Sequence, residues 1–185
     1  MLKTVNRQIF YHIQHGNQKI SKSGDILDIG STENYFMGFY RTFNLNTVPL
    51  QTAYAELRRY FREQIFENVR EKYFPNYPSR KKCLWLIPDS PKLNEALTFW
   101  IPQVVGNINN PFRILKLSCT GNVCYTCEEF LSLEKCNTLE ATHENAVHYW
   151  NGDNVAIDSP HVEVLFCGTA SVQEVIDPFD PKHQL

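Results

Sequence analysis

The sequence has no long apolar run. No stretch of about 18 apolar residues, the length that a membrane-spanning helix needs, occurs in its 185 residues. The N-terminal residues also lack the apolar core and small-residue cleavage site of a secretory signal peptide. We therefore expect a soluble, cytoplasmic protein with no membrane among its partners.

A strong excess of charge of either sign is missing as well. Lys and Arg together number 18 and Asp and Glu number 20, giving a net charge of -2. This excludes a global basic field that would attract nucleic acid, but leaves a local basic patch open. No internal repeat and no break in composition divides the chain. We expect one domain over residues 1–185, with 176–185 as a loose C-terminal tail.

Six cysteines are present, but they do not make a complete zinc motif. They are Cys83, Cys119, Cys124, Cys127, Cys136 and Cys167. Without a signal peptide, free thiols in a reducing compartment are favoured over disulfides. Cys124 and Cys127 form one Cys-x-x-Cys pair, followed by His143 and His148, but no second pair stands at matching spacing. We expect buried thiols and no metal, and keep a zinc-stabilised interaction domain as a third hypothesis.

The hydrophobic pattern predicts an α+β fold. Apolar residues recur at every third or fourth position between Pro49 and Tyr73, as is typical of a long helix. Further helices are predicted over 90–101, 139–150 and, in a shorter form, 124–136, and a loop with at most a helical turn over 31–47. Strands are predicted over 7–15, 82–88 and 111–119, and a short one follows the Gly24-Asp25 turn within 19–30. Two further strand-like runs are predicted within 160–176, with Gly168 between them as a bulge or a turn. We expect two small, mostly antiparallel sheets that form a central cleft, with helices packed around them.

Two residues in predicted strands are candidates for chemistry. Side chains alternate across a strand, so His12 shares its face with Phe10, in a half-buried setting where an imidazole needs a hydrogen-bond partner. Glu163 stands between Val162 and Val164, and its carboxylate must be either solvated in a cleft or paired. A structural histidine and an exposed glutamate at a strand edge are the alternatives for these two positions.

Several short motifs occur in the order seen in the ADP-ribosyltransferase superfamily. They are Phe10-Tyr11-His12, Gly24-Asp25, Asn34-Tyr35, Pro78-Ser79-Arg80, Leu84-Trp85-Leu86 and Val162-Glu163-Val164-Leu165-Phe166. The part from Tyr11-His12 to Asn34-Tyr35 is similar to the small rifamycin-modifying ADP-ribosyltransferases. The chain as a whole, over about residues 8 to 176, resembles a bacterial family thought to share that fold. The resemblance implies that the expected cleft binds NAD.

The resemblance also implies roles for individual residues. His12 would hydrogen-bond the ribose or amide of NAD, and Glu163 would hold a ribose hydroxyl and stabilise an oxocarbenium-like transition state. The other implied NAD-binding residues are Tyr11, Ser79, Arg80 for a phosphate, and Trp85 for stacking on the nicotinamide. Trp85 stands where the superfamily usually has tyrosine, so the stacking face is kept but a hydroxyl is lost. This interpretation requires His12 and Glu163 to face one cleft.

The expected function is therefore mono-ADP-ribosyl transfer from NAD, as substrate, to a macromolecular acceptor, either protein or nucleic acid. The resemblance implies a toxin or phage-defence effector, for which an antitoxin or other regulatory protein would be a partner. The alternative is a non-catalytic module that binds NAD or another nucleotide, which the Trp85 departure favours. Two weaker candidates are a Cys167 nucleophile with His161 or His12 as base, and a basic patch along Arg58–Arg62 for RNA or DNA.

Overall fold

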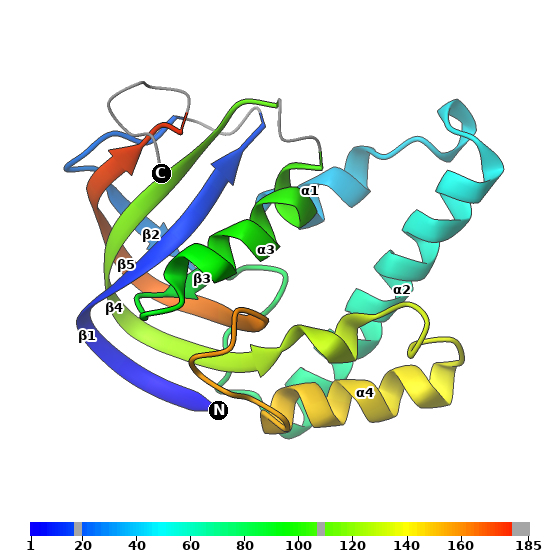
Figure 1. The fold of residues 1–185 in the computed structure, drawn as a ribbon. Coiled ribbons are helices and arrows are strands. Elements are labelled where there is room, and N and C mark those ends of the chain that lie inside the picture. Colours follow the sequence, from blue (N-terminus) through cyan, green and yellow to red (C-terminus); the bar gives the residue numbers. More distant parts are fainter. Residues whose placement is uncertain (17–19, 107–109, 179–185) are drawn as a thin grey trace.

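The computed structural model describes residues 1–16, 20–106 and 110–178, and it shows an α+β fold (Figure 1). The strands are β1 (Leu2–His15), β2 (Ile26–Ile29), β3 (Leu84–Pro88), β4 (Phe112–Cys127) and β5 (Val162–Ile176). The helices are α1 (Tyr35–Thr42), α2 (Leu50–Tyr73), α3 (Leu93–Val105) and α4 (Leu139–Asn151), with short 3-10 helices η1 (Leu45–Thr47) and η2 (Glu128–Leu131). Within the described part of the chain, no helix is long and apolar enough to cross a membrane.

The five strands form one antiparallel sheet that closes on itself, so the expectation of two separate sheets is wrong. Strand β4 pairs with β1 on one side and with β5 on the other along most of its length. Strand β3 completes the ring, because it pairs with β1 through Tyr11 and Ile87 and with β5 through Trp85 and Leu165. One long, bent strand can serve both sides of a barrel-like sheet, which is why separate sheets are not needed.

Alternation along the strands separates an interior core from two outer cores. The interior holds Phe10, Leu86, Leu117, Val164 and Phe166, among others, from strands that face one another across the ring. Helix α3 packs on the outside of β1, β3 and β4, and Figure 1 shows it lying across the sheet. Helices α2 and α4 pack together on the outside of β4 and β5. The candidate residues of the β3–β5 region therefore lie between the sheet and α2.

Helix α2 confirms the prediction for 49–73, but of the apolar residues that recur along it, Val69 is buried and those of the N-terminal half are not. The apolar residues Tyr54, Leu57 and Phe61 are exposed, and the buried stripe instead contains Glu63 and Phe66. The N-terminal half of α2 extends away from the sheet (Figure 1), so its apolar residues meet no core. In the C-terminal half of α2, the charged residues Glu63, Glu67 and Arg70 are buried because each of them forms an ion pair.

Three other segments differ from their predictions. Strand β4 continues to Cys127 where a short helix was expected over 124–136, because the residues of this segment pair with β5 and only η2 is helical. Helix α1 forms in a predicted loop, with the side chain of Asn34 accepting a hydrogen bond from the amide of Met37 as its N-cap. Strand β5 runs unbroken through Gly168. Most of the predicted C-terminal tail, 179–185, lies outside the described residues.

Two glycines lie directly opposite one another in the antiparallel pairing of β4 and β5. Gly121 and Gly168 are register partners, with positive φ values of 148° and 144°. A Cβ on Gly121 would lie 2.3 Å from the carbonyl oxygen of Cys167, and one on Gly168 would lie 2.4 Å from that of Thr120. Backbone atoms cannot move aside as a flexible side chain can, so both positions require glycine.

We predict that Gly121→Ala or Gly168→Ala lowers the free energy of unfolding by at least about 2 kcal/mol, through backbone strain and overpacking. Gly38→Ala is the matched control, because Gly38 lies within α1 and a Cβ there meets no atom within 4 Å. That substitution should leave stability unchanged or raise it by about 0.5 to 1 kcal/mol. Urea unfolding of the three variants measures the difference, and equal stabilities would contradict the close crossing.

Candidate functional site

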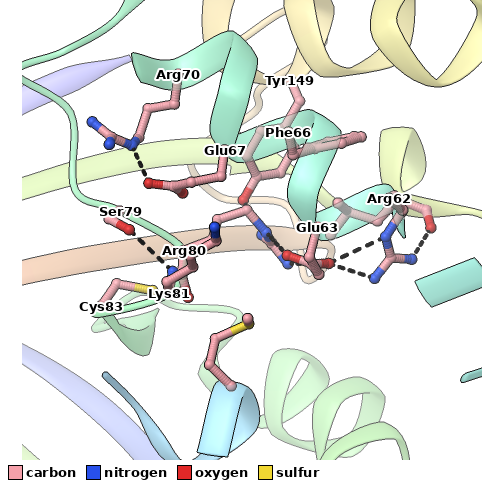
Figure 2. A network of polar contacts seen from close by, with 12 residues as sticks. Arg62, Glu63, Phe66, Glu67, Arg70, Ser79, Arg80, Lys81, Cys83 and Tyr149 are labelled. Atoms are coloured by element: carbon pink, nitrogen blue, oxygen red, sulfur yellow. Dashed lines mark hydrogen bonds and ion pairs between the residues drawn. The ribbon is translucent and has the colours of Figure 1, made fainter. Parts of the chain in front are cut away.

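A buried arginine joins three elements next to β3. Arg80 lies in the loop between α2 and β3 and is 4% exposed. Its Nε donates to Oε2 of Glu63 on α2 at 2.7 Å, and its Nη1 donates to Oε2 of Glu163 on β5 at 2.6 Å. Nη1 also donates to the hydroxyl of Tyr149 on α4. Figure 2 shows Arg80 and Glu63 in this network, with Tyr149 beside them.

The carboxylate of Glu163 is held from several directions. The Tyr149 hydroxyl donates to Oε2, the same oxygen that Arg80 contacts. Thr126, opposite Glu163 in the β4–β5 pairing, donates to its backbone carbonyl at 3.1 Å and approaches Oε2 at 3.5 Å. Oε1 accepts no hydrogen bond from the described residues and is not among their fully enclosed polar atoms. One carboxylate oxygen is thus fixed while the other stays available.

The charges in this cluster compensate one another. Burial alone would raise the pKa of Glu63, but Arg80 and Arg62 outweigh it and lower this pKa to about 2. Burial raises the pKa of Tyr149 well above its usual value, so its hydroxyl stays protonated and can donate. Burial opposes the charge of Arg80, yet Glu163 and Glu63 raise its pKa well above normal. A cation between two carboxylates is the arrangement in which a buried arginine is stable.

A second buried pair lies one turn along α2. Nε of Arg70 donates to Oε1 of Glu67 at 2.7 Å (Figure 2). Nη1 of Arg70 also donates to the carbonyl of Pro75 at 3.2 Å. Oε2 of Glu67 is enclosed and meets no hydrogen-bond partner in the described structure. Among the described residues, no hydrogen bond or ion pair joins this pair to Glu163, so Glu67 offers a buried carboxylate for comparison.

His12 meets this region through Trp85. Its Nδ1 lies 2.9 Å from the carbonyl oxygen of Trp85, so Nδ1 carries the proton and donates it. Burial lowers the pKa of His12 to about 4 despite this hydrogen bond, which keeps the imidazole neutral at pH 7. The guanidinium carbon of Arg80 lies 5.8 Å from the centre of the Trp85 ring. Contacts thus connect His12, Trp85, Arg80 and Glu163 in series.

His12 and Glu163 nevertheless point to opposite faces of the sheet. Alternation places His12 with Phe10 on the interior side, whereas Glu163 shares the outer side with Leu165, against α2 and α4. Strands β1 and β5 are not neighbours here, because β3 lies between them. The expectation that both side chains face one cleft is therefore wrong, and His12 reaches the site only through the backbone of Trp85.

The other predicted residues occupy different surroundings. Tyr11 is buried in the core beneath α3. Ser79 lines a cavity of about 100 Å³ beside the loop that carries Arg80. Arg80 itself is enclosed by carboxylates, so the structure does not present it to a phosphate as the sequence suggested.

The weaker candidates are not assembled as the sequence suggested. Arg58 donates to the carbonyl of Leu133, and Arg62 pairs with Glu63, so the predicted basic patch largely turns inward. The Cys167 thiol donates to the carbonyl of Ile29 at 3.3 Å, and burial raises its pKa, whereas His161 packs on another residue, Phe99. All six cysteines are free, as expected, and the described residues contain no cluster of three or more potential metal ligands.

Sequence reasoning missed Glu63, Tyr149 and Thr126. Glu63 precedes the buried Phe66 by three residues, so it lies on the same face of α2, which could have marked it as a buried carboxylate. Tyr149 falls within the predicted helix over 139–150, and Thr126 falls within the predicted short helix over 124–136, where the structure has strand β4 instead. Neither position carries a local signal, because their role depends on how α4 and β4 meet β5.

One protein family matches the region of the chain that contains this cluster. A family model described as "Protein of unknown function (DUF2441)" matches residues 41–178 of the 185. The chain belongs to the DUF2441 family. The matched DUF2441 region includes Glu63, Arg80, Tyr149 and Glu163, and it begins after His12. No curated protein matches the chain.

Removing the central cation should strongly destabilise the protein. We predict that Arg80→Met lowers the free energy of unfolding by about 3 to 5 kcal/mol, because Glu63 and Glu163 are then left buried without their shared partner. Arg41→Met is the control, since Arg41 pairs with Glu33 at the surface and its loss should cost less than about 1 kcal/mol. Urea unfolding compares the two, and equal costs would contradict the central role of Arg80.

The neutral state of His12 should make the protein acid-sensitive. The unfolded chain binds the His12 proton below about pH 6.5, but the folded protein binds it only near pH 4. The free energy of unfolding should therefore fall by about 3 kcal/mol as the pH drops across this interval. His12→Asn keeps a donor near the Nδ1 position and should remove most of this fall, with His15, whose pKa burial also lowers, supplying the rest. An unchanged pH profile in the variant would refute the assignment.

Proposed function

We propose that this protein transfers ADP-ribose from NAD to an acceptor macromolecule, with Glu163 as the catalytic carboxylate. The observation that carries the proposal is the state of Glu163, whose Oε2 is fixed by Arg80 and Tyr149 while Oε1 accepts no hydrogen bond from the described residues. A preorganised carboxylate of this kind stabilises positive charge without first having to reorient. The ordered motifs shared with the ADP-ribosyltransferase superfamily support the assignment to NAD.

The proposed chemistry makes use of that negative charge. The bond between the nicotinamide nitrogen and the ribose C1' breaks, and its electron pair leaves with nicotinamide. Positive charge develops on the ribose, and Oε1 of Glu163 would stabilise it there, because stabilisation counts most where the charge appears in the transition state. The acceptor then forms the new bond to C1' and loses its proton to solvent. Arg80 and Tyr149 act on this step only by holding Glu163.

Helix α1 covers the proposed stacking surface. Phe36 packs edge-on against the ring of Trp85, with ring centres 5.7 Å apart. The cavity at Ser79, at about 100 Å³, is smaller than the roughly 300 Å³ of a typical small-molecule site. Binding of NAD at Trp85 therefore requires α1 to move away from β3. His12 would hold the Trp85 backbone in place during this movement.

A non-catalytic module that binds NAD or another nucleotide is the second candidate. Two observations favour it: His12 and Glu163 lie on opposite faces of the sheet, and Trp85 has no hydroxyl. A protein with this function would bind through the ring of Trp85 and leave the carboxylate a structural part of the Arg80 cluster.

Release of nicotinamide from NAD tests the enzyme without knowledge of the acceptor, because water can replace it. We predict that Glu163→Gln lowers the rate at least about 100-fold, the cost typical of losing one group that stabilises the transition state. Glu67→Gln is the matched control, because Glu67 is also a buried carboxylate paired with an arginine, in the neighbouring ion pair. It should change the rate by only a few-fold. Thermal unfolding of both variants shows whether each is folded.

Two results would decide against the transferase. Equal nicotinamide release by the folded Glu163→Gln variant would eliminate Glu163 as the catalytic residue. A rise in melting temperature with millimolar NAD but no nicotinamide release, with or without cell extract as acceptor, would establish the binding module instead. Absence of both responses would refute the two candidates together.

A further inference from the structure

A small cavity beside the Arg80 loop has a lining of hydrogen-bond donors. It measures about 100 Å³ and lies where the loop before β3 meets the end of β2 and the crossing of β4 and β5. Its lining includes the side chains of Asn76, Ser79, Lys82 and Asn122 and the thiol of Cys167. The other lining residues are Gly30, Tyr77, Pro78 and Cys83. A water molecule takes up about 30 Å³ in the liquid, so the space suits a few waters or one small polyatomic ion.

Asn76, Ser79, Lys82 and Asn122 keep side-chain donors that are not used elsewhere in the described structure, whereas the Cys167 thiol already donates to the carbonyl of Ile29. The hydroxyl oxygen of Ser79 accepts from the amide of Lys81 at 3.2 Å, and its own proton meets no acceptor among the described residues. Asn122 accepts from Thr4 through Oδ1 at 3.0 Å, which leaves its amide group free to donate. Within the same residues, the side chains of Asn76 and Lys82 make no hydrogen bond or ion pair, although the backbone amide of Lys82 donates to the carbonyl of Ser79 at 3.0 Å. Several donors and one full positive charge therefore border a single cavity.

Charge selects the kind of ligand. Among the described residues that line the cavity there is no carboxylate, and Lys82 contributes an ammonium group. Burial and, next, the carboxylate of Asp28 raise the pKa of the Cys167 thiol, and the ammonium group of Lys82 acts to lower it to a smaller extent. Asp28 acts on the same thiol in the opposite sense, but it is exposed and is not part of the lining. The lining thus complements an anion with several acceptor oxygens.

We propose that this cavity binds a phosphate group, with Lys82 as the charged ligand and Ser79, Asn76 and Asn122 as neutral donors. The neighbouring Lys81 does not take part, because its ammonium group donates to Gln64 on α2 at 2.8 Å. The phosphate can be free or can belong to a nucleotide, since both present the same oxygens. The site does not depend on the proposed transferase activity. It also supplies the phosphate contact that the buried Arg80 cannot.

Binding is tested by isothermal titration of the full chain with inorganic phosphate, with ADP-ribose, and with adenosine as the uncharged comparison, in sodium chloride of matched ionic strength. Lys82→Gln should weaken binding of the phosphate-bearing ligand at least 10-fold. Lys81→Gln is the control and should change it less than 2-fold. Asn122→Asp keeps the acceptor for Thr4 but adds a carboxylate to the lining, and should abolish binding. Melting temperatures verify that each variant is folded.

The outcomes separate the two phosphate sources from failure of the proposal. Phosphate and ADP-ribose binding with similar affinity, both dependent on Lys82, identifies a site for free phosphate. ADP-ribose binding alone, with the same dependence, identifies a nucleotide phosphate. Two results overturn the proposal. One is equal binding by wild type, Lys82→Gln and Asn122→Asp, and the other is no binding of either ligand at a concentration of about 10 mM, roughly ten times the dissociation constant of a millimolar site. Failure of the phosphate site would leave the transferase proposal standing, because nicotinamide release tests that proposal separately.

Discussion

The ion pairs of Arg80 set the arrangement of the elements around them. A guanidinium can be buried only with anionic partners, and here the partners come from α2 and β5, with a hydroxyl from α4. The strands and helices that carry these groups are far apart in the sequence, so the cluster forms only when the sheet and both helices are in place. Apolar packing alone would permit α2 to slide or rotate on the sheet. The directional bonds of a planar guanidinium remove that freedom.

The two halves of α2 differ in which side chains they bury. The charged residues of the C-terminal half point inward. There Glu63 pairs with Arg80, and Arg62 donates to the carbonyl of Leu131. The N-terminal half carries Tyr54, Leu57 and Phe61 outward, away from the sheet. Periodicity reports which residues share a face of a helix, but it does not report which face is covered. The periodicity therefore predicts the helix correctly, but it does not predict which of its residues are buried.

The same distinction applies to the rest of the chain. Elements with a strong local pattern, such as α4 and the strand that contains His12, could be predicted because alternation and helical spacing are properties of neighbouring residues. Closure of the sheet could not, because it depends on β3 meeting two strands at once. In the site, Glu163 could be singled out as a charged residue within an apolar strand. Its partners Tyr149 and Thr126 could not, since only the packing of α4 and β4 brings them to it.

The closed sheet also imposes an order on events during synthesis. Strand β1 leaves the ribosome first, yet its partner β4 begins only after α2, β3 and α3 have been made. The apolar side of β1 therefore waits without its main neighbour, and the ring cannot close until β5, near the end of the matched family region, has emerged. Such long-range pairing is slow compared with helix formation. The nascent chain consequently exposes an unpaired strand until β4 has been made, a state in which chaperones commonly protect a polypeptide.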